Sequence, residues 1–300
     1  MRSVSKVVDT TPIHMSHAGV TLHRVIGTLD IDGHGTAHPV ADVDPFLLLD
    51  ESRVEGNVSS SFKKHPHTGL TAVTYLLEGT AHAWDNINGA TTDLNRAGGV
   101  YCVSAGRGVV HGEAPIEGMR KVRLLQLWFN PGIYKLRLPK ANYQLFQPDE
   151  LPIHQDDTLW AKVIIGEGFN MTSPVLSNWP IQYLHIRMAP DQTCTFNIPD
   201  SAWQGFIYVI NGQGKFGCNE VLGIEQQCVI FGSETSSSIQ VTNTSPDSLE
   251  FVLASGKPHQ KPFIKLLGHG GAIVADTESR ARSWMKEYEA DPEHFGLTFA

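Results

Sequence analysis

Two short motifs constrain the fold of this chain more than any other feature of its sequence: His65-Pro66-His67 and His111-Gly112-Glu113. In each motif, two side chains with nitrogen or oxygen donor atoms lie two residues apart. Residues at that spacing share one face of an extended strand, but they do not face each other on a helix. Proline also keeps the residue before it out of the helical region, which favours an extended His65. The motifs therefore predict two β-strands that each present a pair of donor groups.

If the two strands are neighbours, three imidazoles and one carboxylate converge, and we expect His65, His67, His111 and Glu113 to bind a metal ion. A lone His-X-His is more often structural, and the second motif after a glycine-rich segment is what favours a metal site. These ligands differ from the thiolate-rich sites of structural zinc and resemble the two-histidine, one-carboxylate site of non-haem Fe(II) oxygenases, with one extra histidine. A six-coordinate metal would keep two positions for substrate and O2. The ligands alone do not rank iron against manganese, nickel, cobalt, copper or zinc.

Short apolar runs bounded by turn residues predict that most of the chain is β-structure. We expect strands at residues 45–49, 72–77, 100–103, 109–110 and 122–129, and a second set at 183–188, 205–210, 227–231 and 249–254. One amphipathic helix is expected at residues 277–289, because its apolar residues recur with helical spacing. Asp276 or Thr277 can serve as its N-cap.

The second set of strands is similar to the first. Residues 75–79 correspond to 208–212, and residues 102–106 correspond to 228–232 in the same order. This pattern predicts a duplicated β-domain. At the positions that correspond to the four donor residues, the second half has Ile198, Asp200, Ser237 and Ile239, so one metal site per chain is expected.

A segment with three prolines near residues 139–152 looks like a connector between the two copies. We therefore expect an N-terminal metal-binding domain at residues 1–140. A degenerate C-terminal domain at residues 141–300 would include the connector and the C-terminal helix.

Composition and charge exclude several classes of function. With 41% apolar residues the core can be sizeable, and a net charge of −8 without a basic run does not suit direct nucleic-acid binding. The N-terminus lacks an apolar signal segment, and no apolar stretch approaches the length of about 18 residues that a membrane helix needs, so we expect a cytoplasmic protein. Cys102, Cys194, Cys218 and Cys228 form no CxxC motif and are expected to be free thiols. There is no nucleophile elbow, Walker loop or dinucleotide fingerprint.

Several stretches of the chain resemble the pirin family of the cupin superfamily. They are His65-Pro66-His67-Thr68-Gly69, residues 44–50, residues 74–79 and residues 104–113. The sequence His294-Phe295-Gly296, which follows the predicted helix, is similar to the tail of the family.

This resemblance implies a bicupin, in which two antiparallel β-barrels, each a double-stranded β-helix, lie face to face and only the N-terminal one holds metal. It implies His65, His67, His111 and Glu113 as the ligands, usually around iron. It also implies two kinds of function. Some pirins act as quercetin 2,3-dioxygenases, and others are known as transcriptional co-regulators that sense the redox state of iron.

The chain departs from the family's pattern beside the ligand positions. Thr68 stands where pirins typically have Arg, and Thr71 stands where they have an acidic residue. Gly112 replaces the usual Ser, and Gly98-Gly99 replaces a Gly-Asp pair. The four ligand positions are kept while their surroundings differ, so the substrate is less determined than the metal site.

We therefore expect an iron-dependent dioxygenase that cleaves a flavonol such as quercetin with O2, in which Glu113 accepts the proton of the substrate hydroxyl. Its partners would be a small polyphenol and O2. One alternative is an iron-binding redox sensor without turnover, whose partner would be a protein because no basic stripe suits DNA. Another is a cupin isomerase or hydrolase that converts a small polar substrate without O2.

Overall fold

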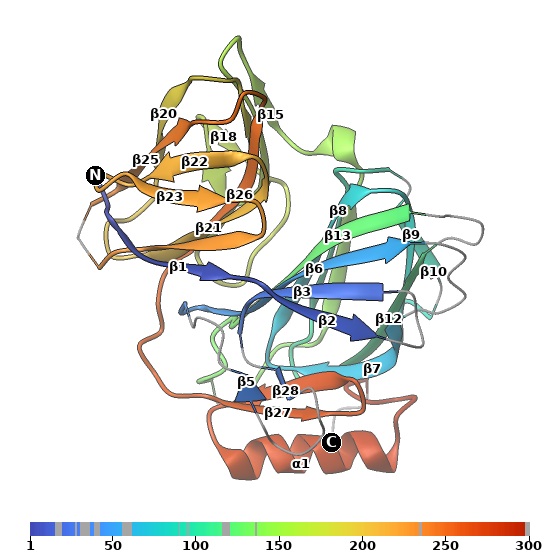
Figure 1. The fold of residues 1–300 in the computed structure, drawn as a ribbon. Helices are drawn as coiled ribbons and strands as arrows, with labels where there is room; N and C mark the ends of the chain where they lie inside the picture. Colours follow the sequence, from blue (N-terminus) through green and yellow to red (C-terminus); the bar gives the residue numbers. More distant parts are fainter. Residues whose placement is uncertain are drawn as a thin grey trace.

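The computed structural model describes residues 1–15, 20–27, 29–30, 37–38, 43–55, 62–89, 91–94, 96–115, 121–135, 137–233 and 236–297. These residues form two β-barrels, one mainly blue to green and the other mainly yellow to orange in Figure 1, with a helix at the far end of the first barrel. The predicted all-β bicupin is confirmed.

The first barrel is built from a large sheet and a small sheet. The large one has seven strands in the order β14 (Asn142–Phe146), β11 (Val100–Ser104), β8 (Thr71–Glu78), β13 (Lys121–Phe129), β6 (Phe46–Glu55), β3 (Val20–Ile26) and β2 (Thr11–Met15). The small one has six strands in the order β10 (Thr91–Leu94), β9 (Ala81–Asp85), β12 (Val109–Pro115), β7 (Phe62–Thr68), β28 (Gly271–Ala275) and β27 (Ile264–Gly268).

The second barrel has the same plan. Its large sheet has the order β1 (Val4–Asp9), β24 (Gln227–Phe231), β21 (Gln204–Asn211), β26 (Leu249–Gly256), β19 (Ile181–Met188), β16 (Leu159–Ile165) and β15 (Ile153–Gln155). Its small sheet has the order β20 (Thr193–Asn197), β25 (Ser238–Asn243), β22 (Gln213–Phe216) and β23 (Val221–Ile224). Short elements complete the described chain: β4 (Leu29–Asp30), β5 (Ala37–His38), β17 (Glu167–Gly168), β18 (Met171–Thr172) and the 3-10 turn Pro148–Glu150.

The two large sheets match strand by strand, as the internal repeat predicts. The order β11-β8-β13-β6-β3-β2 in the first corresponds to β24-β21-β26-β19-β16-β15 in the second. The corresponding stretches 75–79 and 208–212 cover the ends of β8 and β21 and the residue that follows each. The stretches 102–106 and 228–232 begin on β11 and β24 and continue into the turns after them. The strand order therefore agrees with a duplicated domain.

Segments near both ends of the chain pair with strands of the other half. β1 pairs with β24 in the second barrel, whereas β28 pairs with β7 in the first. β14, which follows residue 140, pairs with β11 of the first barrel. The division between residues 140 and 141 stays a prediction about folding units, but strand pairing crosses it in both directions.

The outer faces of the two large sheets form the core between the barrels. Leu125 and Leu127 of β13 are fully buried there together with Phe206 and Val252 of the second barrel. Phe46 meets Phe206 edge to face, with ring centroids 5.3 Å apart. Because side chains alternate along a strand, this outer apolar face leaves the other face of each strand to line the barrel interior.

The helix α1 (Glu278–Ala290) begins one residue after the predicted start. Thr277 is its N-cap, and the Thr277 hydroxyl accepts a hydrogen bond from the backbone N–H of Arg280. Its buried residues Ala281, Trp284 and Met285 pack on Ile273 and Ala275 of β28, so the helix holds β28 from outside the first barrel. The predicted helix and its N-cap are confirmed.

All four cysteines are free, as expected. Within the described ranges, no helix combines the length and the apolar character needed to cross a membrane.

Candidate metal centre

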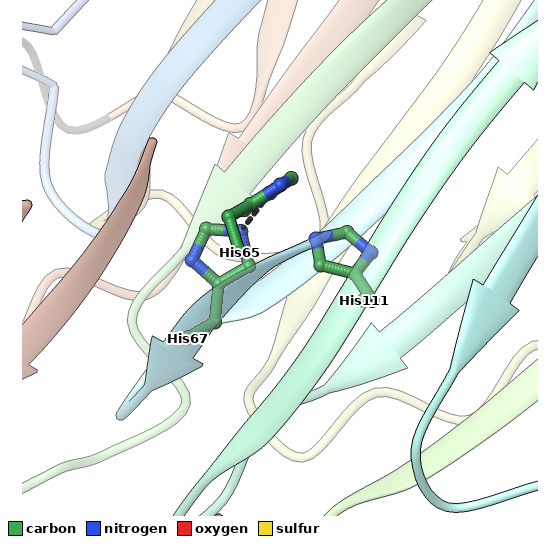
Figure 2. A group of neighbouring side chains, drawn as sticks. All are labelled: His65, His67 and His111. Atoms are coloured by element: carbon green, nitrogen blue, oxygen red, sulfur yellow. Dashed lines mark hydrogen bonds between the residues drawn. The ribbon is translucent and has the colours of Figure 1, made fainter. Parts of the chain in front are cut away.

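The two histidine motifs lie on neighbouring antiparallel strands. In the pairing of β7 with β12, His65 lies opposite His111 and His67 lies opposite Val109. Figure 2 shows the three imidazoles turned toward one another, His65 and His67 from β7 and His111 from β12. The ring centroids are 4.5 Å apart for His65 and His111 and 4.8 Å apart for the other two pairs. The structure therefore brings three of the four predicted ligands together.

Burial keeps these three imidazoles neutral. Desolvation lowers the pKa of His65, and it lowers the pKa values of His67 and His111 well below the ordinary value of 6.5. The neighbouring histidines lower the pKa values of His67 and His111 further. A neutral imidazole has a free lone pair on one ring nitrogen, which is the form that binds a metal. At neutral pH the three imidazoles are therefore uncharged already, and none of them must lose a proton from an imidazolium before it can bind a metal.

The polar atoms of the cluster fit a metal ion. One ligand atom from each histidine lies within 4.8 Å of the others. Both ring nitrogens of His111 are buried and have no hydrogen-bond partner among the described residues. A buried polar atom without a partner costs about 1–3 kcal/mol, and coordination would remove part of that cost. Three nitrogen donors in a buried site suit a transition metal such as iron, nickel, copper or zinc.

Two backbone carbonyl groups hold the outer nitrogens of the cluster. The Nδ1–H of His65 donates to the carbonyl of Lys63, at 2.6 Å, and Nδ1 of His67 lies 3.2 Å from the carbonyl oxygen of Ala272. Such contacts orient an imidazole and leave its other nitrogen, here Nε2, for a metal. Sequence reasoning did not identify these partners. The adjacent glycines Gly270-Gly271 were the one available signal, because glycine often marks a close approach of two backbones.

Glu113 lies outside the group formed by the three histidines. Its buried carboxylate accepts a hydrogen bond from the hydroxyl of Thr74, which also lies 2.8 Å from the side-chain oxygen of Gln126. Burial raises the pKa of Glu113 to about 7, although the hydrogen bond from Thr74 opposes this rise. The assignment of Glu113 as a fourth ligand stays a prediction.

A row of polar side chains crosses the inner face of the large sheet toward Glu113. Thr74 pairs with Gln126, Gln126 with Asp50, and Asp50 with Arg24, so the four share one face. Arg24 and Asp50 form a buried ion pair with Nη2 and Oδ2 2.8 Å apart. The negative charge of Asp50 in this row is therefore balanced by the positive charge of Arg24. Sequence reasoning missed it, because only the register of four distant strands places these residues together.

Trp128 supplies an aromatic surface beside the cluster. Its ring lies 4.8 Å from the ring of His67, edge to face. Its indole nitrogen is buried and has no hydrogen-bond partner in the described part of the chain. Gln126 and Trp128 are two residues apart on β13, so both face the barrel interior. These two residues could have been noticed in the sequence as bulkier or more polar positions within an apolar strand.

A cavity of about 350 Å³ lies apart from this centre. It opens between the turns at Gly69 and Gly106 and the segment that contains Lys135 and Arg137, and Asn178 of the second half closes one side. None of the three histidines lines it. It is therefore a separate feature of the surface where the two halves of the chain meet.

Comparison with known proteins agrees with the fold and the motifs. The family described as Pirin matches residues 27–129, and the family described as Pirin C-terminal cupin domain matches residues 183–295. Human pirin is 33% identical over 238 residues, which cover 79% of this chain and 79% of that protein.

Two solved structures share the fold. The quercetin 2,3-dioxygenase from Acinetobacter baumannii has a TM-score of 0.82 at 18% identity, with 98% of both chains covered. The bacterial pirin YhhW from Escherichia coli, in complex with nickel(II), has a TM-score of 0.63 at 17% identity, covering 84% of this chain and 100% of that one. At these identities the likeness shows the fold alone. The two family matches together span well over half of the sequence, and human pirin is 33% identical over 79% of this chain, so this chain belongs to the pirin family.

Proposed function

We propose that this protein is a metal-dependent dioxygenase of the pirin type that cleaves a flavonol such as quercetin with O2. Iron is the first choice of metal, and His65, His67, His111 and Glu113 would hold it. The observation that carries the proposal is the cluster of three buried, neutral imidazoles, in which both nitrogens of His111 have no partner among the described residues. The names of two structural neighbours, a quercetin 2,3-dioxygenase and a pirin in complex with nickel(II), support it.

The side chains around the cluster have distinct roles in this proposal. A divalent metal bound there would act as a Lewis acid on a phenolic hydroxyl of the substrate. Glu113 would accept the proton of that hydroxyl, while the hydroxyl of Thr74 holds one carboxylate oxygen in place. The ring of Trp128 would pack on the aromatic substrate. The electron-rich substrate anion would then react with O2, two ring carbon–carbon bonds would break, and carbon monoxide would leave.

Oxygen uptake by the iron-loaded protein in the presence of quercetin tests this function. We expect O2 consumption and loss of quercetin absorbance with iron-loaded protein, and neither with metal-free protein under the same conditions. Proteins loaded with manganese, nickel, cobalt or copper should be compared in parallel, since the ligands accept all of them. No uptake with any metal would contradict the dioxygenase, and conversion of a small polar substrate under argon would point to isomerase or hydrolase chemistry instead.

A redox sensor without turnover is the second candidate, and strand β8 favours it. Thr74 contacts Glu113 beside the cluster, whereas the next residue, Tyr75, points to the opposite face. The hydroxyl oxygen of Tyr75 lies 2.7 Å from Nδ1 of His185 in the second barrel. One strand thus links the centre to the interface between the barrels. Iron-bound protein that consumes no O2, but whose hydrogen exchange on β8 and β19 differs between Fe(II) and Fe(III), would support the sensor.

Replacing Thr74 by Val is expected to weaken metal binding by about ten-fold, because the hydroxyl orients Glu113 and partners of this kind typically contribute factors of 10–100. Thr74→Ser keeps the hydroxyl and should bind metal like the unmodified protein. The dissociation constant for Co(II), measured by competition with a chelator, checks both. If the Val and Ser variants bind Co(II) equally well, the Thr74 contact has no part in the site.

A further inference from the structure

We infer that β28, near the C-terminal end of the chain, positions a ligand of the metal centre in the first barrel, because the peptide group of Ala272 orients the ring of His67. This inference rests on the proposed metal-binding function and adds a positioning element to it. The centre would then be assembled from two segments about 200 residues apart in the sequence.

The geometry places the Ala272 peptide directly on the outer nitrogen of His67. β28 runs parallel to β7, with Ala272 opposite His67 and Ile273 opposite Thr68. Both the carbonyl oxygen and the backbone nitrogen of Ala272 lie 3.2 Å from Nδ1 of His67. His67 is only 1% exposed, so water does not compete for this nitrogen. The ring is therefore held through Nδ1, and Nε2 faces the other histidines.

This peptide group can hold His67 in either neutral form. The Nδ1 of His65 must carry a proton, because its partner, the carbonyl of Lys63, can only accept. The Nε2 of His65 is then an acceptor, and Nε2 of His67, 3.2 Å away, donates to it. In that form Nδ1 of His67 accepts from the N–H of Ala272. If Nε2 held a metal, the proton would lie on Nδ1 and would be donated to the carbonyl of Ala272 instead. The ring need not turn between the two forms.

Glycine at position 271 allows the close approach that this contact needs. A Cβ atom at residue 271 would lie 1.9 Å from the carbonyl oxygen of Pro66, a backbone atom that cannot move aside by itself. Just after β7, Gly69 has a φ of +69°, and a Cβ atom there would lie 2.0 Å from the carbonyl oxygen of Val274. Trp284 and Met285 of α1 pack in one apolar cluster with Ile273 and Ala275 of β28. Glycines at positions 271 and 69 thus allow the backbones of β28 and β7 to approach each other closely.

Gly271→Ala should separate β28 from His67 and raise the dissociation constant for Zn²⁺ by about ten- to hundred-fold, the range that loss of an orienting partner gives. Gly268→Ala on β27 is the matched control, because its Cβ would meet only the flexible end of Met285, at 2.9 Å. It should bind Zn²⁺ like the unmodified protein. Equal Zn²⁺ affinity in Gly271→Ala, while the unmodified protein binds Zn²⁺, would overturn this inference alone. An unmodified protein that binds no metal would overturn the proposed function as well.

A measurement on the unmodified protein keeps the inference testable if Gly271→Ala does not fold. Long-range ¹H–¹⁵N NMR reports which imidazole nitrogen carries the proton. We expect the proton of His67 on Nδ1 in the Zn²⁺-loaded protein and on Nε2 in the metal-free protein. Coordination of Zn²⁺ through Nδ1 of His67 would overturn the assignment of Ala272 as its orienting group.

Discussion

Protein in which His65 and His111 are both replaced by Ala is expected to retain no metal, whereas the unmodified protein, purified without chelator, should carry close to one ion per chain. The two residues lie opposite each other on β7 and β12, so the double substitution leaves His67 as the one imidazole of the cluster. A single imidazole with one carboxylate is too weak a site to survive purification. Elemental analysis of both proteins measures the effect.

The double variant should still fold. In the metal-free protein, both ring nitrogens of His111 are buried without a partner among the described residues, at a cost of about 1–3 kcal/mol. Removing the ring relieves that cost, which offsets part of the lost packing.

Metal that binds only the folded protein stabilises it. Added metal at a hundred times its dissociation constant should raise the unfolding free energy of the unmodified protein by about 2.7 kcal/mol and leave that of the variant unchanged. Thermal unfolding with and without metal measures this difference.

Replacing His154 and His294 by Ala provides the control, since it also removes two histidines. These residues pair with Asp156 and Asp291 away from the cluster, and their side chains are 34% and 61% exposed. This protein should keep its metal and its stabilisation by metal. Equal metal content in the His65/His111 variant and in the unmodified protein would place the metal elsewhere.

The parts of the site that sequence could predict are those set by local spacing. The i, i+2 spacing in His65-Pro66-His67 predicts a strand that presents both histidines on one face, and Pro66 favours the extended conformation of His65. The helix α1 was predictable from its apolar spacing and from Thr277, because capping depends on neighbouring residues. The motif residues that make up the family resemblance lie in the same short stretches.

The parts that sequence could not predict depend on pairing between distant strands. Gly270-Gly271 could signal a close approach of two backbones, but they do not indicate that the carbonyl of Ala272 lies against His67, because that depends on the register between β28 and β7, two strands about 200 residues apart in the sequence. The row from Thr74 to Arg24 has the same origin, since four strands must align before those side chains meet. Glu113 shows a further limit. Its spacing from His111 predicts a shared face, and the unbroken pairing of β12 with β9 is consistent with that, but the spacing does not indicate the contact of its carboxylate with Thr74 in the other sheet.

The internal repeat has a consequence at the interface between the barrels. Tyr75 and Tyr208 correspond in the repeat, and each hydroxyl reaches into the other barrel, Tyr75 to His185 and Tyr208 to Glu51. Glu51 and His185 themselves occupy equivalent positions in the two large sheets. The interface thus has an approximate two-fold relation in which one partner is a carboxylate and the other an imidazole. The sequence repeat did not reveal it, because the two partners are chemically different.

Glu51→Gln is expected to lower the free energy of unfolding by about 3 kcal/mol. The side chain of Glu51 is 0% exposed and accepts hydrogen bonds from Arg53, Arg123 and Tyr208. A neutral amide would leave Arg123 without the carboxylate it contacts and Arg53 with the more distant Glu225, at 3.5 Å, and breaking a buried ion pair in this way typically costs 3–5 kcal/mol. The lower end applies because Arg53 and Arg123 are 28% and 22% exposed. Urea unfolding followed by fluorescence and by circular dichroism measures the change, provided that the two transitions coincide.

Glu220→Gln is the control for this substitution, because Glu220 is 65% exposed and its ion pair with Lys215, at 3.1 Å, is worth less than about 1 kcal/mol.

The pH dependence of stability gives a second check. Burial raises the pKa of Glu51, but hydrogen bonds from Arg123 and Arg53 outweigh it, so the folded pKa lies below the ordinary 4.5. The ionised carboxylate therefore stabilises the protein fully above about pH 4.5, and this contribution is lost as the pH falls through the lowered folded pKa. The difference between the unmodified protein and Glu51→Gln should shrink below that pH. A difference that stays constant down to about pH 3, or one within about 1 kcal/mol of zero at neutral pH, would mean that the buried carboxylate does not hold the two arginines at the interface.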